Sequence, residues 1–93
     1  MDIFAQLAER IIKEQETIIG PIALEQARKV PGLEVDWEKK EVVIKGDEKK
    51  AVEQLIEKYR DFFGNASVEV CRDAVKSIIS KVPQDQLPPL LIR

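Results

Sequence analysis

The residue types that most often carry catalysis or bind metals are scarce in this chain. Among its 93 residues there is no histidine and a single cysteine, Cys71. The chain therefore lacks the commonest general base and neutral metal ligand, and the ordinary zinc sites are excluded. Cys71 lies on an apolar helical stripe, so we expect a buried thiol, with a reactive thiol beside Arg72 as the alternative. We expect no enzyme, no metal and no cofactor.

The glycines and carboxylates form no catalytic or phosphate-binding motif. The glycines are dispersed at expected element boundaries and make no glycine-rich phosphate loop. The carboxylates lie mostly beside Lys or Arg, and none has the spacing of a calcium loop. Four cations remain as a candidate anion site in a pocket between hairpin and helices: Arg28, Lys29, Lys45 and Lys49. They support the alternative function, a small-molecule or nucleotide sensor.

Composition indicates a folded soluble domain with balanced charge. Apolar residues make up 44% of the chain and charged residues 34%, and the net charge is -2 from 17 acidic and 15 basic side chains. A nucleic-acid-binding protein usually has a basic excess or stripe, so no nucleic-acid partner is expected. No stretch has the length of a membrane span or the pattern of a signal peptide. We therefore expect no membrane association and a cytoplasmic location.

One segment has a β pattern, from Leu33 to Gly46. Leu33, Val35 and Trp37 alternate with acidic residues, which is typical of a strand with one apolar face. The polar run 38–41 has the length of a four-residue hairpin loop, and the β-branched run 42–44 follows it. An antiparallel hairpin is predicted. Because an isolated hairpin is marginally stable, helices, a third strand or a second subunit must cover it.

Helical patterns lie on both sides of this hairpin. An amphipathic helix is predicted over 2–19 and a short second one over 22–30, with Gly20-Pro21 between them; one kinked helix is the alternative. After the hairpin, a third helix begins at the N-cap Asp47, carries an apolar stripe through Phe62 and Phe63, and ends at Gly64. A fourth is predicted from Asn65 to Val82, with a strand over 66–70 as the alternative.

The last ten residues, 84–93, form a Pro- and Leu-rich tail. Two prolines exclude a regular helix and favour an extended path. The aliphatic side chains either cover the domain's own core or dock on another subunit. The predicted fold is therefore α+β: two N-terminal helices kinked at Gly20-Pro21, a central antiparallel β-hairpin, two further helices and an extended apolar tail. Residues 1–83 form the compact domain.

A short motif at the first helix junction resembles a known family. The run Ile18-Ile19-Gly20-Pro21-Ile22-Ala23 is similar to the Ile-Gly-Pro-(small or apolar)-Ala core of small regulatory domains associated with bacterial serine/threonine kinases and signalling proteins. The resemblance covers a small part of the chain and implies a non-catalytic regulatory or interaction module. The stretch 42–55 also resembles the strand–Gly–helix units of ferredoxin-like domains, without the Cys-x-x-Cys of their metal-carrying members.

Together these observations predict a non-enzymatic protein–protein interaction or regulatory module. We expect it to form a homodimer and to bind a protein partner, because the hairpin needs cover and the tail is apolar. The predicted contact residues are Trp37, Leu87, Leu90, Leu91 and Ile92. Trp37 has a second interpretation, as a core residue on the inward face of the hairpin.

Overall fold

The computed structural model describes residues 2–92. In this part of the chain the elements are α1 (Ile3–Ile19), α2 (Ile22–Arg28), β1 (Leu33–Asp36), β2 (Glu41–Ile44), α3 (Glu48–Phe63) and α4 (Asn65–Val75). Single 3₁₀ turns follow at η1 (Ile79–Lys81), η2 (Gln84–Gln86) and η3 (Pro89–Leu91). The predicted α+β class, with a hairpin between two pairs of helices, is confirmed. The outermost residues of the predicted domain and tail, Met1 and Arg93, lie outside the described residues.

Local capping sets the ends of the first two helices. The Asp2 carboxylate accepts a hydrogen bond from the backbone N of Phe4 at 3.0 Å, as an N-cap does. Gly20 has a φ of +77°, which a glycine adopts without strain, and it separates α1 from α2. The two-helix prediction is therefore confirmed and the single kinked helix is wrong. The second helix ends at Arg28 rather than Val30.

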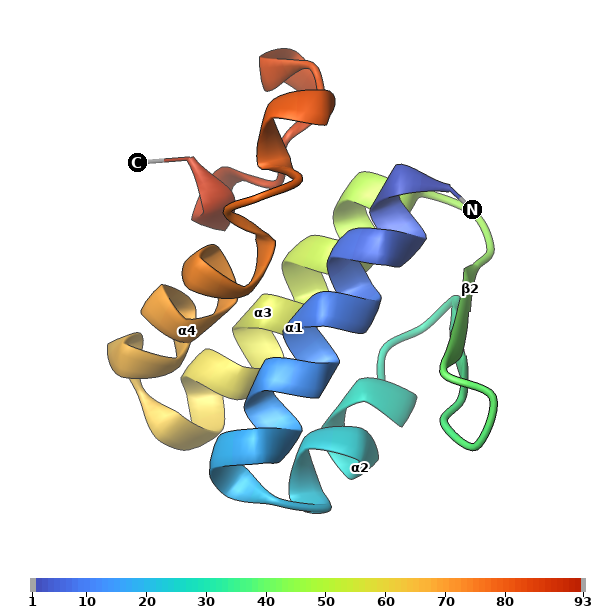
Figure 1. Cartoon of the computed structure of the whole chain (residues 1–93), viewed down its shortest axis with the longest axis vertical. Helices are drawn as coiled ribbons and strands as arrows, with labels where there is room; N and C mark the ends of the chain where they lie inside the picture. The colour runs from blue at the N-terminus through green and yellow to red at the C-terminus, as the bar shows by residue number, and fades with distance from the viewer. Residues whose placement is uncertain (1, 93) are drawn as a thin grey trace.

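Three long helices pack side by side, with α4 antiparallel to α1 (Figure 1). Two hydrogen bonds fix this direction: Arg10 Nη1 donates to Ser77 Oγ at 2.8 Å, and Gln15 Nε2 donates to Ser67 O at 3.0 Å. From Arg10 to Gln15 the residue number rises along α1, while the partner number falls from Ser77, just after α4, to Ser67 near its start. α1 and α3 run in the same direction, so both end where α4 begins (Figure 1).

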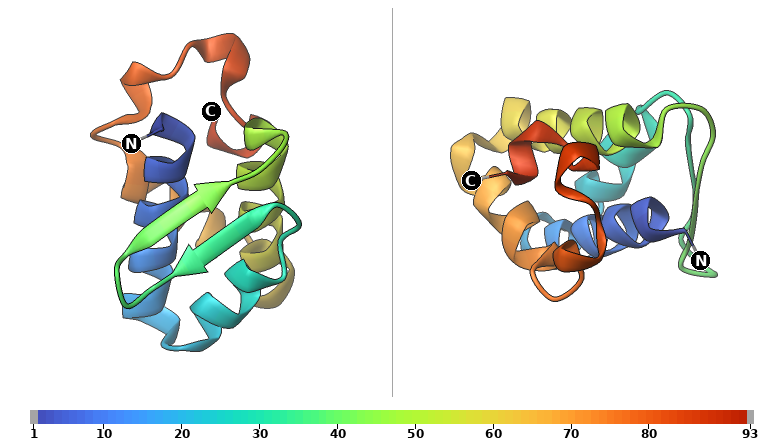
Figure 2. Two further views of the ribbon diagram at one scale, coloured as in Figure 1. Left: turned by 90° about the vertical axis from the view of Figure 1, so that its right-hand side faces the viewer. Right: turned by 90° about the horizontal axis from the view of Figure 1, so that it is seen from above.

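The hairpin covers one side of these helices and lies against α1 and α2 (Figure 2). β1 and β2 are antiparallel, with Leu33 opposite Ile44 and Val35 opposite Val42. Leu33 and Val42 are buried on the helix side, while Glu34 and Val43 face solvent. The cover that the hairpin requires therefore comes from its own helices. The loop is Trp37–Lys40, because Glu41 pairs with Asp36 in the sheet.

The C-terminal part departs from prediction in two ways. α4 is a helix, as predicted, and the alternative strand over 66–70 is wrong, but the helix ends at Val75 and not at Val82. The chain then turns, and Ile78 and Val82 are still buried. The tail is also more compact than the predicted extended path. Leu87 and Pro88 are extended, but η2 and η3 fold the rest into single turns, and η3 packs against α3 and α4 (Figure 2).

A single core joins all these elements. Its largest fully buried side chains come from α1 and α3, with contributions from α4 and the tail. They are Leu7, Ile11, Ile12, Gln15, Val52, Leu55, Ile56, Tyr59, Cys71, Val75 and Pro88. The helices therefore supply most of the apolar burial that stabilises the fold.

Candidate functional site

The four cations predicted to bind an anion do not share one site. Arg28 lines a hollow of about 440 Å³ with Val35, Trp37 and neighbouring residues of the loop. Lys29 lines a different hollow against α3, and Lys49 lines a third at the start of α3. The Lys45 ammonium is ion-paired with Glu34 at 3.0 Å on the exposed sheet face. The structure therefore does not gather these charges around a common ligand, and the sensor alternative gains no support from them.

Trp37 is part of the core, as its second interpretation predicted. Its ring is buried, and its Nε1 donates a hydrogen bond to the Glu16 carboxylate at 3.0 Å. The Lys40 ammonium lies 4.1 Å from the ring centroid, in the geometry of a cation–π contact. These contacts attach the hairpin loop to α1. The indole is thus occupied within its own chain and does not offer a large surface to a partner.

The other predicted contact residues belong to the segment Leu87–Ile92, named here the strap. Leu87 and Leu91 are buried against the chain's own helices, Leu90 is half-buried, and Ile92 is exposed. η3 contacts both α3 and α4. The bulk of the strap's apolar surface therefore covers its own domain. While the strap is docked, Pro89, Ile92 and part of Leu90 are accessible to a partner.

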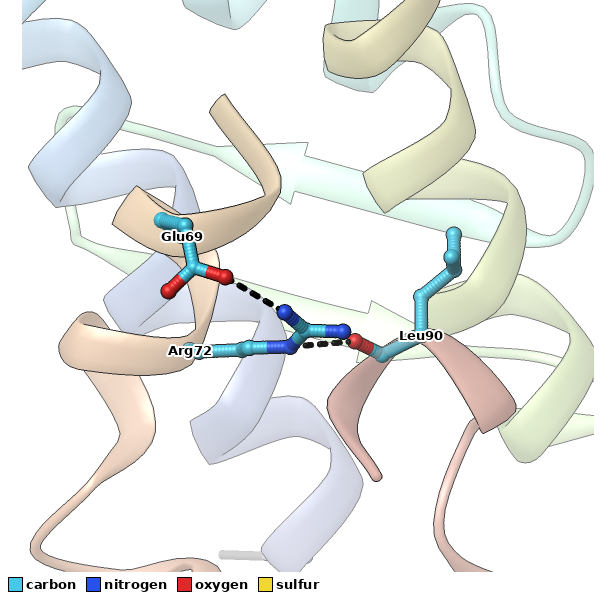
Figure 3. A network of polar contacts seen from close by, with 3 residues as sticks. All are labelled: Glu69, Arg72 and Leu90. Carbon is cyan, nitrogen blue, oxygen red and sulfur yellow. Dashed lines mark hydrogen bonds and ion pairs between the residues drawn. The ribbon is translucent and has the colours of Figure 1, made fainter. Parts of the chain in front are cut away.

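The strap is held by its main chain at one residue. Leu90 N donates to both carboxylate oxygens of Glu53 at 3.2 Å, and Leu90 O accepts from Arg72 Nε at 2.9 Å. Figure 3 shows the Arg72 guanidinium between the Leu90 carbonyl and the Glu69 carboxylate, with which it is ion-paired. Glu53 lies on α3 and Arg72 on α4, so the two helices together hold the backbone N–H and carbonyl groups of one residue, Leu90. We name Glu53 and Arg72 the clamp.

The clamp carboxylate has a shifted pKa. Burial raises the pKa of Glu53 above its ordinary value, and the hydrogen bond from Leu90 N opposes this shift. The nearby charge of Glu57 raises it further, while Arg60 and Lys49 lower it. Hollows of about 290 Å³ and 270 Å³ flank the strap, one beside Arg72 and Leu91 and the other beside Glu53 and Pro89. The strap does not fill the groove in which it lies.

Cys71 is a buried thiol, as expected from its place on the apolar stripe. Its Sγ lies 3.4 Å from Gln15 Nε2, which also donates to Ser67 O. Burial raises the pKa of the Cys71 thiol to about 11, and the hydrogen bond from Gln15 lowers it. A thiol this buried and this weakly acidic is a poor nucleophile at neutral pH.

One apolar surface was not predicted from the sequence. Phe62 and Phe63 continue the stripe of α3, yet their side chains are 56% and 39% exposed, and Ile18 near the end of α1 is 60% exposed. The two phenyl rings are neighbours, with centroids 6.0 Å apart. α1 and α3 end at the same end of the molecule (Figure 1), so all three residues belong to the last turns of helices at that end. We name Ile18, Phe62 and Phe63 the apolar pole.

The stripe pattern predicted burial for both phenylalanines because it cannot show where along a helix the cover stops. Tyr59, one turn earlier, is fully buried. Beyond it the chain reverses at Gly64 into α4 and leaves the last turn of α3 uncovered. Single exposed apolar side chains are ordinary, but a group containing two aromatic rings is a feature of interaction surfaces.

Within residues 2–92, no group of three or more Cys, Asp or Glu side chains is placed to hold a metal ion. None of the helices in the same part of the chain has the length and apolar character needed to cross a membrane. Comparison with known proteins finds no match: no family model, no curated protein and no solved structure is similar to this chain.

Proposed function

We propose that this chain is a non-enzymatic protein–protein interaction module that self-associates, and that a second copy covers the apolar pole. The observation that carries the proposal is the exposure of two adjacent aromatic rings and an isoleucine on one end of an otherwise well-packed domain. Burial of such side chains against a partner gives favourable free energy in proportion to the apolar area removed from water. A regulatory role in the cytoplasm belongs to the same proposal.

Charge favours a second copy as the partner. Most exposed residues near the pole in sequence are uncharged, and one, Asp61, is charged; the uncharged ones are Thr17, Pro21, Gly64, Asn65 and Ala66. A two-fold contact brings a surface against itself, so a strongly charged rim would repel its own copy. Next to Phe62 the chain carries both Arg60 and Asp61, which lets such a contact set opposite charges against each other. The balanced charge of the whole chain also favours a protein over a nucleic acid.

The size of the pole indicates a weak dimer. A standard protein interface buries about 800 Å² on each partner. That is a large share of the 5365 Å² that this chain exposes. Three side chains supply less than that, so we expect a dimer that dissociates on dilution rather than an obligate one.

The test is the double substitution Phe62→Ser, Phe63→Ser, measured by light scattering or sedimentation over a concentration series. Wild-type protein should move from monomer toward dimer mass with rising concentration, and the variant should need a markedly higher concentration to reach the same dimer fraction. The matched control is Val43→Ser, because Val43 is 49% exposed on the hairpin, away from the pole. The proposal would be refuted by a wild type that stays monomeric at the highest concentration. It would also be refuted if Val43→Ser weakened the dimer as much as Phe62→Ser, Phe63→Ser.

A further inference from the structure

The groove between α3 and α4 has the properties of a peptide-binding site. It contacts a short segment of chain through the backbone N–H and carbonyl of one residue, Leu90, and through buried side chains on either side. The buried positions are Leu87, Pro88 and Leu91, which define the pattern Leu-Pro-x-x-Leu. Main-chain hydrogen bonds provide affinity for any segment, while the side-chain positions select the sequence.

The bound segment is already shaped for binding. Leu87 has φ and ψ of -70° and 136°, and Pro88 has -55° and 135°, which are polyproline II angles. Proline restricts the unbound chain to similar angles, so less conformational entropy is lost when the segment docks. A Leu-Pro-x-x-Leu segment can therefore bind as an independent short peptide.

An exposed linker joins the strap to the last core residue before it, Val82. Val82 is buried, but the next four residues, Pro83 to Gln86, are all exposed. One hydrogen bond, from Lys49 Nζ to Asp85 O at 3.3 Å, holds this linker to α3. Rotation within the linker would release Leu87 to Ile92 as a unit. The hollows beside the strap give an incoming segment room to begin contact before the strap has left.

We propose that this groove binds the strap of a second copy of the chain in place of its own. The structure shows that the sequence of the chain's own strap fits the groove. At the clamp it supplies Leu90, which, unlike a proline, has a backbone N–H to donate to Glu53. Reciprocal exchange between two copies re-forms every contact that each copy loses, so it costs chiefly the entropy of association. The tethered strap competes at high effective concentration, so exchange between copies is favoured at high protein concentration.

This exchange goes beyond the proposed function and is independent of it. The clamp lies in the first half of α3 and the second half of α4, whereas the apolar pole lies where α3 ends and α4 begins. The variant Phe62→Ser, Phe63→Ser should therefore retain strap exchange. Substitutions in the strap should in turn leave association through the pole unchanged.

The test uses the full chain and a fluorescent peptide of residues 84–92, followed by fluorescence anisotropy. The double substitution Leu87→Asp, Leu91→Asp puts charges on the two buried strap positions and should empty the groove. We expect this variant to bind the peptide about tenfold or more tightly than wild type, because its own strap no longer competes. The matched control is Ile92→Asp, since Ile92 is exposed and its substitution should leave the groove occupied.

Two further arms identify the clamp as the binding element. Adding Arg72→Ala to the emptied variant should weaken peptide binding about tenfold, because a charged hydrogen bond to the peptide carbonyl is lost. A peptide with proline at the position of Leu90 has no N–H for Glu53 and should bind weakly to the emptied variant. If the emptied variant keeps its helical circular dichroism and does not bind the peptide, the proposal is wrong.

Hydrogen exchange on wild-type protein tests the same proposal if the emptied variant does not fold. The amides of Leu90 to Ile92 should exchange through a local opening, faster than the amides of α1 and α3. A strap whose amides exchange only in global unfolding cannot be replaced by another copy, and that result would overturn the proposal.

Discussion

The Tyr59 hydroxyl on α3 donates a hydrogen bond to the carbonyl oxygen of Ala23 on α2 at 2.8 Å, in the interior of the domain. This bond joins the short second helix to the core. Removal of one buried partner leaves the other without its hydrogen bond. Tyr59→Phe should therefore lower the free energy of unfolding by about 1 kcal/mol. Urea unfolding followed by circular dichroism measures the change, and an unchanged midpoint would contradict it.

The same residue predicts how stability depends on alkaline pH. Burial raises the pKa of Tyr59 well above its ordinary value of 10.0. Above pH 10 the unfolded chain releases the phenolic proton while the folded chain retains it, so the free energy of unfolding falls as pH rises. The slope of this loss is about 1.4 kcal/mol per pH unit for one proton. Tyr59→Phe should reduce the slope, and a variant with the wild-type slope would count against this assignment.

Cys71 should be protected from thiol reagents in the folded protein. Burial raises its pKa from 9.0 to about 11, so the reactive thiolate is rare at pH 8. The rate of reaction with Ellman's reagent should rise toward that of a free thiol as urea unfolds the chain. A native rate close to the unfolded rate would show that the thiol is accessible. The stability contribution of the neutral thiol is present below pH 9 and is lost as pH rises toward 11.

Substitutions of Glu53 separate its charge from its hydrogen bond. Burial raises its folded-state pKa above 4.5, so its contribution to stability is present below that pH and decreases as pH rises through the folded-state pKa. Glu53→Gln keeps an acceptor for Leu90 N without the charge. At pH 7 the free energy of unfolding of Glu53→Gln should equal or exceed that of wild type. At pH 4.5 the difference between the two proteins should be smaller.

Glu53→Ala provides the control for that experiment. It leaves Leu90 N without its partner, and we expect a loss of about 1 kcal/mol at pH 7. Chemical unfolding of the three proteins at both pH values gives the comparison. Equal losses for Glu53→Gln and Glu53→Ala would show that the carboxylate charge, not the acceptor, holds the strap.

Of the four glycines, Gly32 should tolerate substitution by a residue with a side chain least well. Its φ is +82°, and a Cβ at this position would overlap the carbonyl oxygen of Lys45. Gly46 also has a positive φ, +92°, but a Cβ there meets no atom within 4 Å. Gly46→Ala should cost about 1–2 kcal/mol from the backbone conformation alone. Gly32→Ala should add about 1–3 kcal/mol to such a cost because of the overlap. Equal thermal unfolding midpoints for the two variants would contradict this difference.

Local signals in the sequence were sufficient to place the hairpin and most helix ends, although not the C-terminal ends of α2 and α4. The side chain of Asp47 accepts from Lys50 N at 3.0 Å as a predicted N-cap, and Gly64 ends α3. These signals work because caps, turns and alternation depend on residues at most four positions apart. The alternation of apolar and acidic residues also suggested that Trp37 lies in the core, which was one of its two interpretations and is the one that the structure shows.

Other features depended on which segments meet in space. The sequence could not decide whether the strap covers its own domain, because that requires Leu90 to reach Glu53 and Arg72, 37 and 18 residues away. It placed Phe62 in the core because periodicity gives the face of a helix but not the extent of its cover. Apolar pattern and local hydrogen bonds thus determined the elements, whereas burial, exposure and the grouping of charges followed only from the packing of residues far apart in the chain.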